Sequence, residues 1–359
     1  MEEIINSQKN ILGISDFLLL ARKYTENTFL DMNFEELFTQ SITGKIDTHP
    51  LFRNVGIVVG NEVRISVNLM VSVLIIIIIH SIFKTIIENL GNDSSSKVAY
   101  FVQYLIIVTL VTNSFISVLE ITKNTIENII GFMNLLIPLM LNLMLATGCI
   151  TSSTVVQPVL LFMINFMGNT INIFLIPLLL ISVTLGIISN ISDKIQIDKL
   201  SKFLKSSIIW FLGIALTIFT CVLSIEGTLS SSVDGLTAKT AKAAVSNFIP
   251  VVGKILGDAA ETVIGCGNIL KNSVGVIGII IVIGIIAVPI LKIAVLYVSF
   301  YLTSAVCEVV ADEKIVKLIG NIADSYKILL AILFSVSVMF IVGITLVIKI
   351  TNSTLMYRG

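Results

Sequence analysis

The sequence predicts an all-α fold, a polytopic transmembrane helix bundle of about 8–9 spans with amphipathic interfacial helices. Hydrophobic residues make up 55% of the 359 positions, charged residues make up only 13%, and the mean hydropathy is +1.00. These values lie outside the range of soluble globular domains. Several uncharged runs are also as long as the roughly 20 residues that a helix needs to cross a bilayer. We therefore expect an integral membrane protein.

Residues 1–64 hold most of the early charge and are predicted to form a small extramembrane helical segment. One helix is expected from Ser15 or Asp16, and a second after Asn33, which suits an N-cap. Gly44 is expected to end the second helix. The first residues lack the basic and apolar parts of a signal peptide, so the sequence itself does not explain how this segment would be exported.

Residues 65–225 are predicted to contain transmembrane helices 1–6. The region from Glu120 to Glu127 is expected at a membrane interface, and no charged residue follows until Asp193. That uncharged length indicates about three crossings. The expected spans are 65–83, 98–119, 129–149, 155–174, 175–190 and 207–225. Amides in the middle spans need internal partners, which suits either packing or a hydrated interior; they are Asn134, Asn142, Gln157, Asn165, Asn169 and Asn172.

A lysine-rich stretch at 191–206 is predicted to be an amphipathic helix at the cytoplasmic interface. Its lysines are Lys194, Lys199, Lys202 and Lys205. Basic residues in short loops favour the cytoplasmic side. With that stretch inside, the span count places the N-terminus, residues 226–273 and the loop at 311–327 outside, and the C-terminus inside.

Residues 226–273 form an amphipathic, small-residue-rich extramembrane or re-entrant segment between two apolar runs. A helix starting after Pro250 would carry a charged stripe beside a line of small residues that lets another helix approach closely. We consider three roles: a surface helix that joins two spans, a segment that lines or plugs a polar path or docks a partner, and an ordinary loop. The candidate residues are Pro250, Gly253, Lys254, Gly257, Asp258, Ala260 and Glu261.

The C-terminal transmembrane helices are expected in residues 274–350, followed by a short tail at 351–359. The apolar run after Val274 is too long for one crossing, so we expect a break at Lys292. No carboxylate of comparable depth is evident in the sequence as a partner for Lys292. This argues against ion-coupled transport, which favours paired charges near the membrane midplane.

Motifs for chemistry are not found in the sequence. It has no phosphate loop of the GxxxxGK[ST] type, no HExxH, and no nucleophile with a neighbouring histidine, so we expect no enzyme activity and no cofactor. Its four cysteines and two histidines lack metal-ligand spacing. The formal net charge of +0 gives no basic surface for nucleic acid.

The chain resembles the stage III sporulation protein AE family of endospore-forming Firmicutes over about residues 90–350. The resemblance is carried most specifically by NFIPVVGKILGDAAETVIG at 247–265 and LKNSVG at 270–275. Further matching segments are 96–115, 131–144, 151–165 and 186–205. Members of the family usually begin with a signal peptide, which this sequence lacks.

The resemblance implies a multi-pass protein of the mother-cell membrane around the forespore. Its implied role is in a secretion-like channel complex that supports forespore development and late sigma-factor activity. The implied partners are the other membrane proteins of the stage III sporulation A operon and, indirectly, the forespore's stage II sporulation protein Q. Other copies of the same chain, in a homo-oligomer, are a further candidate partner. A purely structural anchor and an autonomous secondary transporter or permease of a small solute are the alternative functions.

Overall fold

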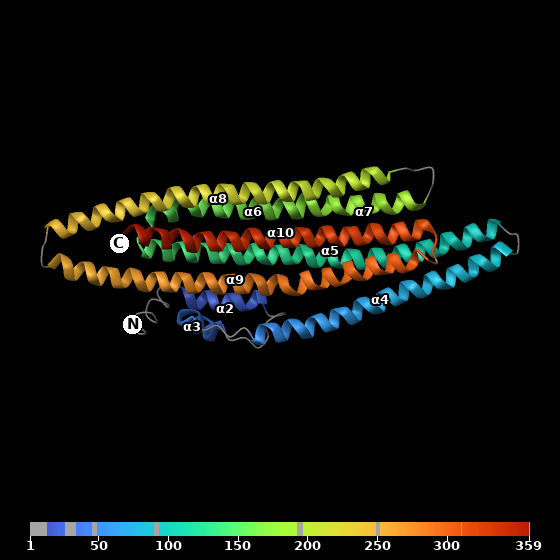
Figure 1. Cartoon of the computed structure of the whole chain (residues 1–359), viewed down its shortest axis with the longest axis horizontal. Coiled ribbons are helices and arrows are strands. Elements are labelled where there is room, and N and C mark those ends of the chain that lie inside the picture. The colour runs from blue at the N-terminus through green and yellow to red at the C-terminus, as the bar shows by residue number, and fades with distance from the viewer. Residues whose placement is uncertain are drawn as a thin grey trace.

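The computed structural model describes residues 13–25, 34–44, 49–89, 93–191, 197–248, 252–309 and 311–358, and within them every regular element is helical. Figure 1 shows the long helices side by side along one axis; the chain reverses direction between successive long helices, except that α6, η1 and α7 continue in one direction. The elements are α2 (Ile14–Thr25), α3 (Phe34–Thr43), α4 (His49–Asn89), α5 (Asp93–Ala146), α6 (Ile150–Thr170), the π-helix η1 (Ile171–Leu175), α7 (Ile176–Ile191), α8 (Asp198–Phe248), α9 (Val252–Cys307) and α10 (Glu313–Arg358).

Six stretches of the described helices are long and apolar enough to cross a membrane. They are Gly60–Ile79, Tyr104–Ala146, Ile150–Asn190, Asp198–Asp234, Ile264–Cys307 and Glu313–Ile350. All but the first have 37 to 44 residues, whereas one crossing needs only about 20. The expected 8–9 spans are therefore not confirmed, because the chain forms fewer helices that are longer than a bilayer requires.

Three expected breaks are absent because the helices continue through them. The charged stretch from Glu120 to Glu127 was expected at a membrane interface between two spans, but it lies inside α5. Between α6 and α7 the chain passes through η1, where the Ile176 N–H donates to the Ile171 carbonyl five residues earlier. Pro177 lacks an N–H and cannot donate the usual helical hydrogen bond to the residue four positions earlier. A π-turn accommodates this missing bond, and the chain keeps its direction. Lys292 likewise lies inside α9, as does Pro289. Prolines in membrane helices are tolerated when neighbouring helices surround them.

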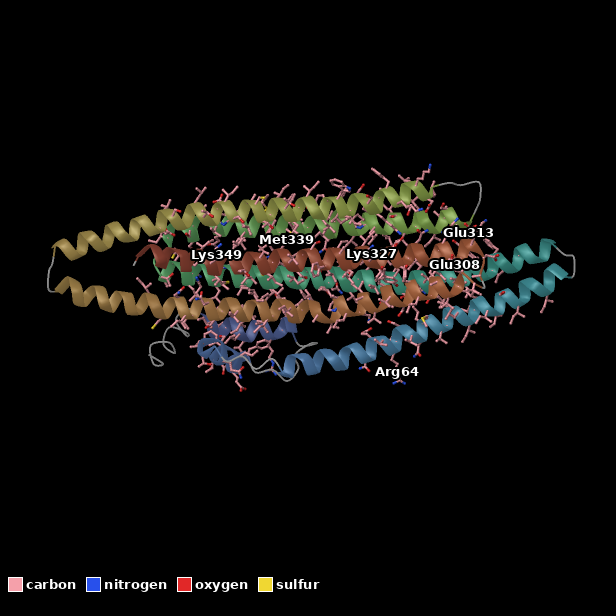
Figure 2. The ribbon with its side chains drawn as sticks, viewed as in Figure 1. Arg64, Glu308, Glu313, Lys327, Met339 and Lys349 are labelled. Carbon is pink, nitrogen blue, oxygen red and sulfur yellow. The ribbon has the colours of Figure 1, made fainter. Side chains whose placement is uncertain are left out.

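Three neighbouring helices share a band without Asp, Glu, Lys or Arg, which we call the uncharged belt. It comprises residues 206–225 of α8, 272–291 of α9 and 328–348 of α10. Figure 2 shows its two ends on α10, marked by Lys327 and Lys349, with Met339 between them. About 20 helical residues rise by about 30 Å, which matches the hydrocarbon core of a bilayer.

Contacts between the helices show that the belt segments of different helices begin and end at similar positions along the bundle axis. At one end Lys271 Nζ donates to the Ile348 carbonyl at 3.1 Å, and Gly227 packs against Ile350. At the other end Lys205 Nζ donates to the Asn321 carbonyl at 2.7 Å. We call this second end, where the lysines of α8 lie, the lysine end.

The arrangement differs from two expectations about which segments lie at the same end of the bundle. The loop at 311–327 was expected opposite the lysine-rich stretch, but the bond from Lys205 to Asn321 puts both at the lysine end. The C-terminus was expected beside that stretch, yet α10 runs away from it and ends near the α5–α6 connection (Figure 1). The count of crossings between the lysine stretch and α10 was too high by one, because α9 does not break at Lys292.

Two hairpins reach past the other helices at opposite ends of the bundle, α4–α5 at the lysine end and α8–α9 at the far end (Figure 1). Most of the apolar stretch of α4 comes after Glu62, which contacts Lys292 at the edge of the belt. That stretch therefore lies beyond the belt toward the lysine end. The outer part of α4–α5 and the uncharged belt are displaced from each other along the bundle.

The N-terminal helices α2 and α3 are present where the sequence predicts them, and Gly44, with φ of 72°, follows α3. They pack on α5 and α9 rather than standing apart. The rings of Phe17 and Phe132 have centroids 5.9 Å apart, and Tyr24 meets Phe132 edge-on at 6.0 Å. Their apolar faces join the core of the bundle.

Candidate functional site

The α8–α9 hairpin contains the segment that the sequence singled out. α9 begins at Val252, which confirms a helix start just after Pro250; Pro250 itself lies outside the described residues. The other candidates lie in the first turns of α9, but their side chains also fall outside the described residues. The small-residue line and charged stripe stay predictions for Gly253, Lys254, Gly257, Asp258, Ala260 and Glu261.

Close approach through glycine does occur in α9, but deeper in the bundle than predicted. A Cβ on Gly275 would lie 2.5 Å from Ile348 Cδ1 and 3.0 Å from Met140 Cε. Gly278 is closed in by Leu136 in the same way. Small residues at these positions let α9 pack tightly between α5 and α10, which is how helices associate in membranes.

Asp234, which the sequence analysis did not single out, ties α8 to the beginning of α6. Its two carboxylate oxygens accept hydrogen bonds from the backbone N–H of Thr151 at 2.9 Å and of Ser152 at 2.8 Å. Cys149, at the N-cap position of α6, makes no side-chain cap bond. A carboxylate at a helix N-terminus satisfies free N–H groups and complements the helix dipole. The 3% exposed Asp234 side chain therefore caps α6 from another helix.

Lys271 is buried at the same end of the belt, with 0% exposure. Its Nζ donates to the carbonyl of Ile348, which joins α9 to α10. A buried ammonium is costly unless it is paired, so this position departs from a purely apolar core. Lys271 belongs to the LKNSVG segment that carried the family resemblance.

The lysine-rich stretch does not form a separate interfacial helix among the described residues, because α8 begins at Asp198 and continues into the belt. Lys202 pairs with Asp198 at 2.7 Å, Lys199 is exposed, and Lys194 lies outside the described residues. Lys205 is buried and bonds to α10. One member of this predicted cytoplasmic set thus has a structural role.

Lys292 has the acidic partner that the sequence analysis did not find. Its Nζ lies 3.3 Å from Glu62 Oε1, and the two side chains are 26% and 14% exposed. Glu62 belongs to the segment expected outside the membrane, but α4 begins at His49 and carries it against α9. The argument against ion-coupled transport from an unpaired Lys292 was therefore wrong.

Amides of the middle spans form cross-helix bonds, as their sequence context predicts. Asn134 on α5 and Asn165 on α6 donate to each other's side-chain oxygens, at 3.2 and 3.0 Å. Asn172, in η1, donates to Glu127 at 3.5 Å. The π-turn therefore coincides with a polar contact, and π-turns are frequent at functional positions.

Among the described residues no group of three His, Cys, Asp or Glu side chains could hold a metal ion. Cys149, Cys266 and Cys307 are buried free thiols, and Cys221 is an exposed one.

Comparison with known proteins identifies the family. The model described as stage III sporulation protein AE matches residues 32–351. The chain belongs to this family. It is 33% identical over 286 residues to the stage III sporulation protein AE of Bacillus subtilis (strain 168), and the match covers 79% of this chain and 72% of that protein. No solved structure matches the chain.

The stage III sporulation protein AE match includes the whole uncharged belt and every contact described above apart from those of α2. The family has a role in sporulation, and the long apolar helices agree with a multi-pass membrane protein.

Proposed function

We propose that the chain is an integral membrane component of the secretion-like channel complex that links mother cell and forespore. In this role it supports forespore development and late sigma-factor activity from the mother-cell membrane around the forespore. Its partners are the other membrane proteins of the stage III sporulation A operon and, indirectly, stage II sporulation protein Q. The observation that carries the proposal is the family match over residues 32–351.

The α8–α9 hairpin is the surface that we assign to these partners. α8 extends past the belt from Glu226 to Phe248, and α9 starts at Val252 and reaches the belt after Lys271. About 20 residues in each arm correspond to about 30 Å of helix beyond the bilayer core. With the lysine end in the cytoplasm, this hairpin would project into the space between the two membranes.

An autonomous secondary transporter is the second candidate, and the pair of Lys292 and Glu62 favours it. The two form a partly buried charge pair at the edge of the uncharged belt, and charge pairs within membrane helices are typical of proteins that couple solute movement to ions. A transporter would act alone, whereas a channel component needs its partners. Uptake of solute by the purified chain in liposomes would therefore support the transporter.

Shortening the hairpin tests the channel proposal. The tip at 238–262 is replaced by a short turn in the sole copy of the gene, which leaves the belt and the cap by Asp234 in place. We expect normal amounts of the chain in the membrane but loss of heat-resistant spores and of late sigma-factor activity in the forespore. The unaltered gene is the matched control. Full sporulation without the hairpin would contradict its role, and full sporulation without the gene would contradict the proposed function itself.

A further inference from the structure

One face of α5 carries polar residues at regular helical spacing. Asn113, Ser117, Glu120, Asn124 and Glu127 follow one another at steps of four and three residues, which places them on a single face of the helix. All of these side chains are exposed. Lys123 and Asn128 are also exposed and flank the same face. We call this set the polar stripe.

Most of the polar stripe lies at the depth of the uncharged belt. At its beginning, Ser114 and Tyr326 share a hydrogen bond of 3.0 Å next to Lys327, where the belt of α10 ends. Farther along α5, Met140 meets Gly275 and Ile348 at the opposite edge of the belt. The segment of α5 between these contacts therefore runs through the belt, and it includes Glu120, Lys123 and Glu127.

Other exposed side chains at belt depth are of the kind that faces lipid. Ile173, next to Asn172 in η1, is 75% exposed, and on α8 Trp210 is 71% and Ile214 is 52% exposed. On α5, by contrast, the Lys123 and Glu127 side chains are 50% and 54% exposed. Charged side chains at bilayer depth almost always face a bundle interior or a water-filled cavity. At this depth the bundle thus exposes large apolar side chains on α8 and at Ile173, whereas α5 exposes charged side chains.

Contacts within the bundle satisfy this polar surface only in part. Lys123 and Glu127 form a loose ion pair at 4.0 Å, and Asn172 reaches Glu127 at 3.5 Å. Asn172 Oδ1 is buried and has no hydrogen-bond partner among the described residues. The groups of α5 and η1 that meet here still have donors and acceptors available for water.

We propose that the polar stripe, together with Asn169 and Asn172, lines a water-filled path at membrane depth that favours cationic over anionic solutes. The inference deepens the proposed function, because a channel component is where such a path would serve. Glu120 and Glu127 outweigh Lys123 by one negative charge. A net negative wall in a low-dielectric surrounding concentrates cations.

Thiol accessibility tests the path in the full chain in native membranes. Cys149, Cys221, Cys266 and Cys307 are replaced, and single cysteines are placed at Ser117, Asn124 or Asn169. The matched control is Ile173→Cys, which is also exposed and lies on η1 next to Asn172. Methanethiosulfonate reagents react with the thiolate, which forms only where water reaches the sulfur. We expect reaction at the stripe positions and none at Ile173.

The charge preference is tested by comparing a cationic with an anionic methanethiosulfonate. We expect the ratio of their rates at Asn124→Cys to exceed the ratio at Ser232→Cys, outside the belt, by roughly tenfold. Glu120→Gln with Glu127→Gln should abolish that excess, and Lys123→Gln should increase it. Equal ratios at both positions would overturn the cation preference.

Two outcomes would overturn the path itself. If Ser117, Asn124 and Asn169 are all unreactive, the stripe is covered by lipid or protein and conducts no solute. If Ile173 reacts as fast as the stripe, the belt is not at bilayer depth and the argument fails. Neither result depends on spore formation. If the path fails this test but the gene is still required for sporulation, the proposed function stands.

Discussion

Lys205 on α8 and Asn321 on α10 are joined by a hydrogen bond of 2.7 Å from the ammonium to the backbone carbonyl. The bond connects helices whose relevant turns are 116 residues apart in the chain. It places the lysine-rich start of α8 beside the charged first turns of α10, which end at Lys327. The far ends of both helices therefore lie together near the α8–α9 hairpin, and this contact fixes which ends of α8 and α10 share one end of the bundle.

Removing the cap on α6 should destabilise the fold. Asp234→Ala leaves the N–H groups of Thr151 and Ser152 without their acceptor, and we expect the free energy of unfolding to fall by about 2–3 kcal/mol. Asp234→Asn should lose most of that amount, because the amide has only one acceptor. Thermal unfolding in detergent, followed by the fluorescence of Trp210, measures the effect. The exposed Glu308→Ala is the control, and equal midpoints for Glu308→Ala and Asp234→Ala would contradict the cap.

Neutralising Lys271 should leave the fold intact. Lys271→Met keeps an unbranched side chain only one atom shorter and removes the cost of burying an ammonium, so we expect unchanged or higher stability, by up to about 2 kcal/mol. Lys271→Glu should unfold the protein, because its carboxylate would face the Ile348 carbonyl. Unfolding midpoints and spore counts are measured together. A stable Lys271→Met protein that cannot sporulate would assign Lys271 to function, whereas a large loss of stability would refute this account of its burial.

Two glycines of similar helical context should respond in opposite directions to the same substitution. At Gly275 a methyl group would collide with Ile348 and Met140, so Gly275→Ala should destabilise by about 1–3 kcal/mol. At Gly213 nothing lies within 4 Å of the position of a Cβ, so Gly213→Ala should gain up to about 1 kcal/mol from helix propensity. The same unfolding assay compares them. A shift of equal sign at both sites would exclude close packing at Gly275.

Swapping the two charges of Glu62 and Lys292 should be tolerated better than reversing the charge of either residue alone. Glu62→Lys or Lys292→Glu places like charges about 3 Å apart in a partly buried site, and we expect low amounts of the chain in the membrane. The double exchange restores opposite charges and should recover most of the loss. Immunoblots of membrane fractions give the readout. Failure of the exchange to rescue either single variant would show that the two residues do not act as a pair.

Composition and periodicity were sufficient to predict an all-helical membrane protein, the helices α2 and α3, and the start of α9. They could not predict the number of spans, because rules of span counting assume that a helix ends where the bilayer ends. Here α5 and α9 continue past charged residues such as Glu127 and Lys292. Their continuity depends on packing against neighbouring helices, which a single sequence does not show.

The candidate site was predictable only in part for the same reason. Asn134 and Asn165 were recognised as residues that need partners, and they bind each other. Asp234 was missed because an acidic residue shortly after an apolar run usually only marks where a transmembrane span ends. Its role depends on the first turn of α6, about 80 residues earlier in the chain. Glu62 was missed because its partner lies 230 residues away.

The central claim is that the uncharged belt crosses the membrane with the lysine end in the cytoplasm. The most direct test is to measure on which side of the membrane Lys202, Lys317 and Ser232 lie. Each position receives a single cysteine in the otherwise cysteine-free chain, which is produced in intact non-sporulating cells, where the outer face of the membrane is open to an impermeant thiol reagent. Both lysine positions are exposed and lie at the lysine end, whereas Ser232 lies past the opposite edge of the belt. The account predicts labelling at Ser232→Cys, and none at Lys202→Cys or Lys317→Cys until the membrane is permeabilised. Labelling of Lys317→Cys but not Lys202→Cys in intact cells would place the two on opposite sides and contradict the structure.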